Sequence, residues 1–325
     1  MKRRNLTLAA LCFSAFCAAN AQNASNGNGA VLKVDNSILS VEFVKNDVVR
    51  VRWTCGDSIT ANDNGICVPH KQQRIKLKHA DSAKQLSLTS DSLTVRIDKA
   101  TGALTYLDSK GRVILSENSN KPHAGEKIYV ENVTFDETTR RTVKTADGDK
   151  EVMDVLRRDT VGSAWKWTLN LSFNEKEAVY GLGGYMEDYM NLRHKKVYLC
   201  QHNLKEMVPV LNSTAGYGIL VNAGSEMIFD DTKGNASIEI GAAPQLDYYF
   251  MKGHNMDATV SNYRWLTGQA PMMPLYLFGY TQSKERYVSS ADLIGTLKRF
   301  RDMHIPIDMI VQDWNYWEPG SWGHM

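Results

Sequence analysis

The sequence predicts a mostly β protein, in which an antiparallel β-sandwich is followed by the first β-α-β unit of a truncated (β/α)8 barrel. Two observations support this fold class. Between residue 30 and about residue 266, short alternating or apolar runs recur between turn signals, as in a large sandwich. After Gly268 the pattern changes to strand, helix and strand, as in a parallel α/β unit.

The N-terminus has the features of an export signal. Three basic residues follow Met1, residues 6–19 form a short and mostly apolar stretch, and Ala19-Asn20-Ala21 is a small-x-small cleavage site. Neither early cysteine follows a small residue, which disfavours a lipoprotein signal. We therefore expect a signal peptide over residues 1–21, a flexible lead-in over residues 22–29, and a periplasmic or secreted protein.

Several runs in residues 30–268 have the pattern of sandwich strands. In residues 165–173 the apolar side chains alternate with polar ones, which predicts a strand with one buried face. The polar stretch 136–153 predicts an exposed hairpin or loop. Further strands are expected at residues 38–44, 48–53, 93–97 and 104–107.

Two glycine-containing segments follow. The run Tyr180–Tyr185 lacks the Lys-Ser/Thr of a phosphate loop, so its glycines are expected to allow a tight backbone turn. The residues after it include Glu187, Asp188, Arg193 and His194, which form either a ligand-facing loop or an ordinary surface loop. Residues 212–222 predict a structural hairpin.

The second part of the chain predicts a β-α-β unit. The apolar run 275–280 predicts a strand buried on both faces. Ser289 or Ser290 is expected to cap a helix with Asp292 in its first turn, and the next strand is expected at residues 307–311. Residues 275–325 are far fewer than the roughly 250 of a complete barrel, so we expect a fragment.

The composition argues against several classes of protein. A net charge of +2 argues against a nucleic-acid surface, and no stretch after the signal has the apolar length of a membrane span. Cys55 and Cys67 either form a disulfide, with Cys200 left over, or all three cysteines are unpaired and mostly buried thiols. No Cys/His spacing indicates zinc, and no metal or cofactor is expected.

Asp313 is the main candidate for a functional residue. It follows the last predicted strand and precedes Trp314, Tyr316 and Trp317. Catalytic and binding groups of β/α barrels lie at this strand end, where a carboxylate and flat aromatic faces suit a sugar. The alternative is that Asp313 caps a turn and the tryptophans pack the barrel mouth.

Taken in order, several segments resemble glycoside hydrolase family 31, the retaining α-glucosidase and α-xylosidase family. These segments are Tyr180–Gly183, Gln201–Asn203, Val208–Leu211, Gly216–Leu220, Asp247–Phe250, Tyr263–Gly268, Pro274, Phe278–Tyr280, Gln282–Ser283, Arg286–Tyr287, Ile305–Asp308 and Gln312–Trp314. The resemblance implies a galactose mutarotase-like sandwich over residues 30–268 and the start of the catalytic barrel over residues 269–325.

The resemblance also implies a function. The family hydrolyses O-glycosidic bonds with two carboxylates on later barrel strands, so this chain alone is expected to be inactive on an α-linked oligosaccharide or xyloside. Asp313 matches the aspartate that binds the non-reducing sugar, with Trp314 and Asn315 beside it. A sandwich loop that leans over the active site is expected within residues 183–192. Gln-Asp-Trp-x-Tyr-Trp is similar to the α-xylosidase form, with α-glucosidase close behind.

Two other classes remain open at this stage. A non-enzymatic carbohydrate-binding sandwich would need only residues 30–268. A purely structural surface protein would leave the aromatic cluster after Asp313 unexplained.

Overall fold

The computed structural model describes residues 27–61, 64–71, 73–145 and 148–317, and the expected signal peptide lies outside them. The chain divides into two compact units, Met1–Gly268 and Gln269–Met325. Among the described residues, antiparallel sheets make up the first unit and a β-α-β unit makes up most of the second. The predicted fold class is therefore confirmed.

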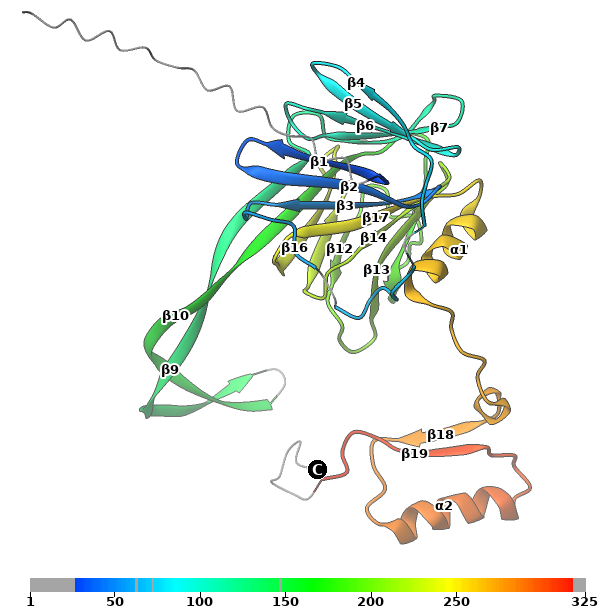
Figure 1. Ribbon diagram of the computed structural model, residues 1–325. Helices are drawn as coiled ribbons and strands as arrows, with labels where there is room; N and C mark the ends of the chain where they lie inside the picture. The colour runs from blue at the N-terminus through cyan, green and yellow to red at the C-terminus, as the bar shows by residue number, and fades with distance from the viewer. Residues whose placement is uncertain (1–26, 62–63, 72, 146–147, 318–325) are drawn as a thin grey trace, which may run out of the picture. The chain divides into compact units, whose positions relative to one another are not determined.

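The first unit contains two antiparallel sheets (Figure 1). As far as the structure describes the chain, the seven-stranded sheet has the order β1 (Gly29–Val34), β2 (Ser37–Lys45), β3 (Val48–Thr54), β17 (Leu246–Lys252), β14 (Tyr217–Val221), β13 (Glu206–Ser213) and β11 (Val179–Gly184). The ten-stranded sheet has the order β12 (Lys196–Leu199), β15 (Met227–Asp230), β16 (Ala236–Ala243), β10 (Gly148–Ser172), β8 (Val113–Glu117), β7 (Leu104–Asp108), β6 (Leu93–Asp98), β5 (Gln85–Thr89) and β4 (Lys78–Asp81), with β9 (His123–Thr145) paired to β10.

The main core lies between these sheets and follows the alternation of the sequence. Trp167, Leu169 and Leu171 of β10 are fully buried, as the alternation in residues 165–173 predicts. Val41 and Phe43 of β2 are buried in the same cluster. Side chains between these positions point to the opposite face of each sheet.

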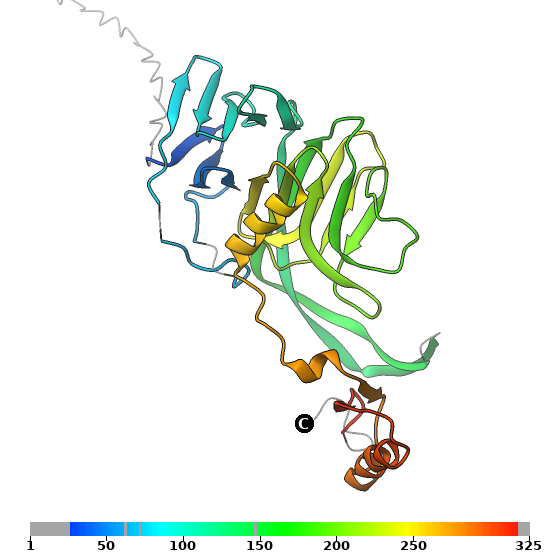
Figure 2. The same cartoon turned by 90° about the vertical axis from the view of Figure 1, so that its right-hand side faces the viewer.

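Helix α1 (Met256–Thr267) interrupts a region whose pattern predicts only strands. The Asn255 side chain caps it by accepting a hydrogen bond from the backbone N of Ala258 at 2.9 Å. The helix lies against β13, β14 and β17 (Figure 2). Its Leu266 joins a second, smaller core on the outer face of the seven-stranded sheet, with Tyr249 and Met251.

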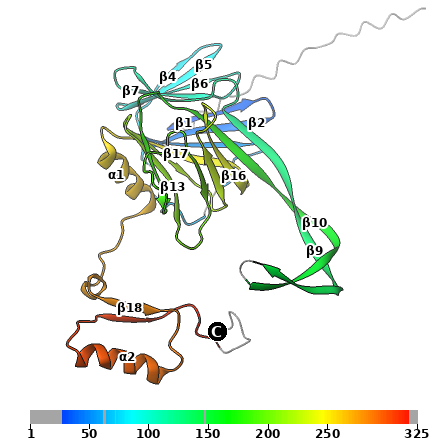
Figure 3. The ribbon, with the colours of Figure 1, turned by 180° about the vertical axis from the view of Figure 1, so that it is seen from behind.

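Strands β9 and β10 continue beyond the sandwich as a two-stranded arm (Figures 1 and 3). The predicted hairpin or loop at residues 136–153 lies in this arm, and its described residues are mostly exposed, as expected. Ion pairs join its two strands, including Arg141 Nη1 to Asp154 Oδ1 at 2.9 Å. Because each arm strand has only one partner over most of its length, the arm adds little to the core.

The second unit contains the predicted parallel β-α-β arrangement. Strand β18 (Thr281–Lys284) pairs with β19 (Met309–Gln312), and α2 (Ser290–Asp302) connects them. Ser289 caps α2 by accepting a hydrogen bond from the backbone N of Asp292 at 3.1 Å. The helix, its cap and the parallel pairing are confirmed.

The predicted strand at residues 275–280 is wrong. Residues Leu275–Phe278 form a 3₁₀ helix instead, and Leu275 is 87% exposed. The pairing with β19 begins at Thr281. Just before it, Tyr280 O accepts hydrogen bonds from the backbone N–H groups of Asp308 and Met309 at 3.0 and 3.2 Å. An apolar run does not become a strand unless a neighbouring backbone pairs with it.

The structure shows the state of three cysteines and the contacts of Asn28, near the end of the expected lead-in. Cys55, Cys67 and Cys200 are free, half-buried thiols, which corresponds to the second of the two alternatives. Asn28 is buried, and its side chain bonds to Gln73 O at 2.5 Å and Ile75 N at 2.9 Å.

Candidate functional site

The carboxyl ends of β18 and β19 lie at one edge of the two-stranded sheet. Lys284, the last residue of β18, pairs with Gln312, the last residue of β19. Since the strands are parallel, the loops after them begin side by side. Glu285 begins the first loop and Asp313 begins the second.

Asp313 is exposed and accepts no hydrogen bond from the residues that the structure describes. The alternative that it caps a following turn therefore has no support in the described contacts. Trp314 is 46% exposed, and its ring centroid lies 5.8 Å from that of Trp317. A carboxylate next to accessible aromatic surface suits hydroxyl groups and apolar C–H faces of a sugar.

Asn315 connects the two loops instead of pointing freely to solvent. Its backbone N donates to Glu285 O at 3.3 Å, and its Nδ2 donates to Glu285 Oε1 at 3.2 Å. Gln312 makes a second connection, because its Oε1 accepts from the backbone N of Tyr287 at 2.9 Å. Asp313 is thus bracketed by two residues that bind the neighbouring loop.

A second candidate region follows β11 in the first unit. Gly181 and Gly183 have φ values of 113° and 108°, and a β-bulge separates them. A Cβ added at Gly183 would lie 1.9 Å from Glu206 O, so no other residue fits there. These glycines bring β11 close to β13 across the bulge. Residues Val179–Gly184 form a strand, so the expected tight turn at Tyr180–Tyr185 is wrong.

Side chains of residues 185–192 make a loop surface with aromatic and sulfur groups. The rings of Tyr185 and Tyr189 lie 6.1 Å apart. Glu187 Oε1 accepts from Lys205 Nζ at 2.8 Å, which ties this loop to the turn between β12 and β13. Burial, and then the charges of Tyr189 and Glu187, raise the pKa of Tyr185 to about 12.

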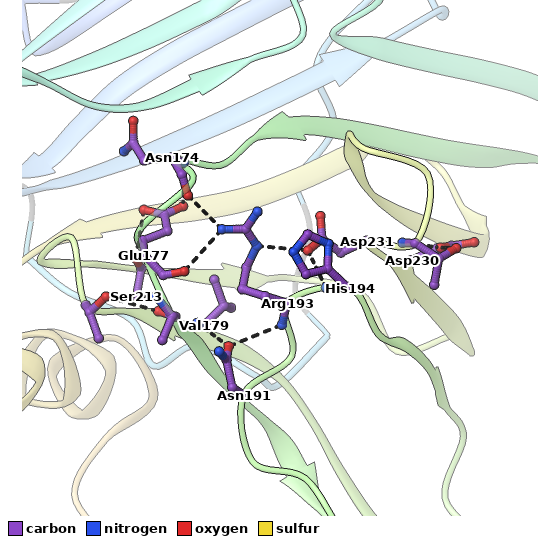
Figure 4. A network of polar contacts seen from close by, with 12 residues as sticks. Asn174, Glu177, Val179, Asn191, Arg193, His194, Ser213, Asp230 and Asp231 are labelled. Carbon is purple, nitrogen blue, oxygen red and sulfur yellow. Dashed lines mark hydrogen bonds and ion pairs between the residues drawn. The ribbon is translucent and has the colours of Figure 1, made fainter.

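A polar network fixes the far end of this loop (Figure 4). Arg193 Nε donates to Asp231 Oδ2 at 2.8 Å, and its Nη1 donates to Asn174 O at 2.7 Å. The backbone N of His194 donates to the same Asp231 oxygen at 2.7 Å. Arg193 is therefore used inside the protein, and the interpretation that it faces a ligand is wrong.

Sequence reasoning missed a buried polar cluster between the two sheets. Glu117 Oε1 accepts from Tyr248 OH and contacts His123 Nε2 at 2.9 Å, while Glu117 Oε2 accepts from Leu104 N at 2.8 Å. The Tyr106 and Tyr248 hydroxyls are 2.9 Å apart. All of these side chains are buried, so the cluster specifies the core and is closed to a ligand.

The described residues contain no candidate metal site and no candidate membrane-spanning helix. Residues 27–317, apart from the gaps given above, hold no group of three His, Cys, Asp or Glu side chains arranged for a metal ion. Neither α1 nor α2 combines the length and apolarity of a membrane span, and these residues offer no other such helix.

Two family models match the chain. Residues 38–230 match the glycosyl hydrolase 31 N-terminal galactose mutarotase-like domain, and residues 270–325 match the glycosyl hydrolases family 31 TIM-barrel domain. An alpha-xylosidase of Saccharolobus solfataricus is 28% identical over 90% of this chain and 36% of its own length. An uncharacterized family 31 glucosidase of Pseudescherichia vulneris is 22% identical over 91% of this chain and 54% of its own length.

Solved structures share the fold. A family 31 alpha-xylosidase from a soil metagenome, complexed with xylose, superposes with a TM-score of 0.72 at 20% identity, over 91% of this chain and 42% of that one. A Flavobacterium johnsoniae family 31 dextranase mutant complexed with isomaltotriose superposes with a TM-score of 0.68 at 20% identity, over 90% and 34%. The chain thus spans only about a third to a half of these proteins.

Proposed function

Because the chain belongs to glycoside hydrolase family 31, we propose that it is the N-terminal part of a retaining, exo-acting α-glycosidase that hydrolyses O-glycosidic bonds. The observation that supports this most is the exposed Asp313 carboxylate directly after β19, next to accessible tryptophan surface. In this proposal Asp313 accepts hydrogen bonds from the terminal sugar. Trp314 packs against its C–H face, and Asn315 holds the loop beside it.

An α-xyloside is the preferred substrate, with an α-glucoside second. Alpha-xylosidases are among the similar proteins in both sequence and structure. Asn315 stands where the form typical of many α-glucosidases has a second aspartate. An amide cannot accept hydrogen bonds as an anion does, and its Nδ2 is already directed to Glu285.

The proposed reaction needs two further carboxylates. Retaining hydrolysis uses a nucleophile and a general acid/base about 5–5.5 Å apart, and both are proposed to come from later barrel strands. The 325-residue chain alone should therefore not turn over aryl α-xylosides. Robust turnover by this chain would contradict that part of the proposal.

Asp313→Asn in the enzyme encoded by the complete reading frame tests the binding role. Losing charge-assisted hydrogen bonds to a sugar costs about 1.5–3 kcal/mol, so kcat/KM for an aryl α-xyloside should fall roughly 10- to 150-fold. Asp302→Asn is the matched control, because Asp302 is exposed at the end of α2. Equal activity of the two variants would contradict the proposed sugar-binding role of Asp313.

The rival function is a non-enzymatic sugar-binding sandwich. It predicts xyloside or glucoside affinity that Asp313→Asn leaves unchanged, and no hydrolysis even by the complete protein. Calorimetric titration of the unmodified protein and of Asp313→Asn with a xyloside and a glucoside, together with the turnover assay, distinguishes the two functions.

We also propose that the protein is exported to the periplasm or secreted, on the basis of the sequence pattern in residues 1–21. N-terminal sequencing of the protein recovered from cells tests this. A mature chain beginning near Gln22 is expected, and retention of Met1 would contradict export by cleavage.

A further inference from the structure

The seven-stranded sheet carries a cavity of about 460 Å³ on the face that points away from the main core. Strands β2, β3 and β17 form its floor, and a crossing segment (residues 64–71 and 73–77) and the end of α1 form its walls. Its size lies within the range of roughly 300–1,000 Å³ that is usual for small-molecule sites. The residues that line it all belong to the first unit, whereas Asp313 belongs to the second.

Backbone and side-chain hydrogen bonds hold the walls in place. At one end of the crossing segment, Val68 N donates to Leu266 O at 2.8 Å. At its other end, Asn28 bonds to Gln73 O and Ile75 N at 2.5 and 2.9 Å. The cavity is therefore bounded by parts of the chain that are fixed to one another.

One wall of the cavity contains a stack of two aromatic rings. The rings of His70 and Trp265 are stacked, with centroids 3.8 Å apart and planes 9° apart. Each ring covers one face of the other, and an outer face of the stack suits the C–H face of a pyranose ring.

Arg50 supplies an unused donor group at the floor. Its Nε and Nη2 donate to Asp247 Oδ1 and Oδ2 at 3.0 and 2.6 Å, whereas its Nη1 has no partner among the described residues. The guanidinium carbon lies 5.3 Å from the centre of the Tyr249 ring, which fixes its plane. Burial lowers the pKa of Arg50, but the hydrogen bond and charge of Asp247 outweigh it and keep the group charged.

The charges around the cavity favour an anion. Asp247 offsets Arg50, and Glu42 offsets Arg52 through an ion pair of 3.2 Å. Lys71 lines the cavity with no acidic partner among the described residues, so one positive charge remains. A carboxylate can bind between Lys71 and Arg50 Nη1 through charge-assisted hydrogen bonds.

We propose that this cavity binds a sugar acid, that is, a pyranose ring that carries a carboxylate. The sugar ring packs against an outer face of the Trp265–His70 stack, and the carboxylate is held by Arg50 and Lys71. Such a site shares no residue with the proposed glycosidase site and gives the sandwich a ligand of its own.

Cys67 provides a local test, because this thiol lines the cavity whereas Cys200 does not. The 325-residue chain is alkylated with iodoacetamide with and without D-glucuronate, and the modification rate of each cysteine is followed by mass spectrometry. Burial raises the pKa of the Cys67 thiol, so the reaction is run at mildly alkaline pH. Saturating D-glucuronate should slow modification of Cys67 about tenfold or more and leave Cys200 unchanged.

D-glucose and acetate at the same concentration distinguish the parts of the proposal. Each carries only one of the two recognised features, so each should slow Cys67 less than about twofold at that concentration. The proposal is overturned if D-glucuronate leaves the Cys67 rate unchanged, if it slows Cys200 equally, or if D-glucose or acetate protects equally well.

Lys71→Ala and Lys110→Ala form a matched pair of variants. Both lysines are exposed, but Lys110 lies in the turn between β7 and β8, outside the cavity lining. Lys71→Ala should raise the half-protecting D-glucuronate concentration about tenfold by removing one charge-assisted bond, and Lys110→Ala should not. Equal values for the two variants would refute the proposed anion site. Because no turnover is measured, either result leaves the glycosidase proposal to its own test.

Discussion

Asn315 is bonded to Glu285 through both its backbone and its side chain, at 3.3 and 3.2 Å. The two residues belong to the loops that follow β19 and β18, so this pair of bonds joins neighbouring loops at one sheet edge. Asp313 begins the loop after β19. The position of the Asp313 carboxylate therefore depends on Glu285, which is not itself a candidate for sugar binding.

Glu285→Ala should weaken the proposed activity without removing any sugar contact. The loss of the side-chain acceptor for Asn315 frees the loop, and one such hydrogen bond contributes about 1 kcal/mol, so kcat/KM of the complete enzyme should fall roughly fivefold. Glu285→Gln retains an Oε1 acceptor and should stay within about twofold. Equal losses in both variants would show that charge, not the hydrogen bond, is what matters.

Gly183→Ala should destabilise the sandwich strongly. The backbone at Gly183 has φ 108°, and an added Cβ would meet Glu206 O at 1.9 Å, so strand β11 must move away from β13. We expect the free energy of unfolding in urea to fall by about 3 kcal/mol or more. Gly184→Ala is the control, since its Cβ meets nothing within 4 Å, and it should change the stability by less than about 1 kcal/mol.

Tyr248→Phe should test the buried cluster between the sheets. The Tyr248 hydroxyl donates to Glu117 and accepts from Tyr106, so its removal leaves two buried groups without this partner. Chemical denaturation should show a loss of about 1–3 kcal/mol. The same change at Tyr129, which is 63% exposed on the arm, should be nearly neutral, and a similar loss there would contradict this reasoning.

Glu177 should give the fold a specific pH dependence. Burial raises the pKa of Glu177 above its ordinary value of 4.5, although hydrogen bonds from Ser213 and Tyr217 oppose the shift. Between the ordinary and the raised pKa, the folded state holds the proton more often than the unfolded state does. Ionisation of Glu177 therefore lowers stability as pH rises through this window.

Glu177→Gln removes this titration and should flatten the corresponding part of the curve. Urea unfolding of both proteins, measured from pH 4 upward, gives the difference in unfolding free energy at each pH. That difference should change in favour of the variant as pH rises. A constant difference across the window would show that Glu177 does not titrate abnormally.

Local signals in the sequence were sufficient for α2 but not for α1. Ser289, Asp292 and a regular apolar stripe identify the beginning and face of α2. Asn255 and Gly268 bracket α1 in the same way, yet the adjoining stretch resembles strands. Contact with the outer face of the seven-stranded sheet stabilises α1, and one sequence does not reveal such a contact.

Long-range polar contacts were beyond sequence reasoning. Arg193 binds Asp231, and Tyr248 binds Glu117, across 38 and 131 residues of sequence respectively. Each polar residue has many possible partners, and only the register of the strands selects one. For the same reason the position of Asp313 after a strand was predictable, whereas the anchoring of Asn315 by Glu285 was not.

The length of the β9–β10 arm can change without disturbing the core of the sandwich. In the far part of the arm, the described residues 131–145 and 149–160 contribute no side chain to either hydrophobic cluster. Insertions or deletions there change chain length without opening a void, and a longer surface loop costs little entropy. Paired gains and losses on β9 and β10 would preserve the register, so relatives can differ widely in arm length while keeping the same body.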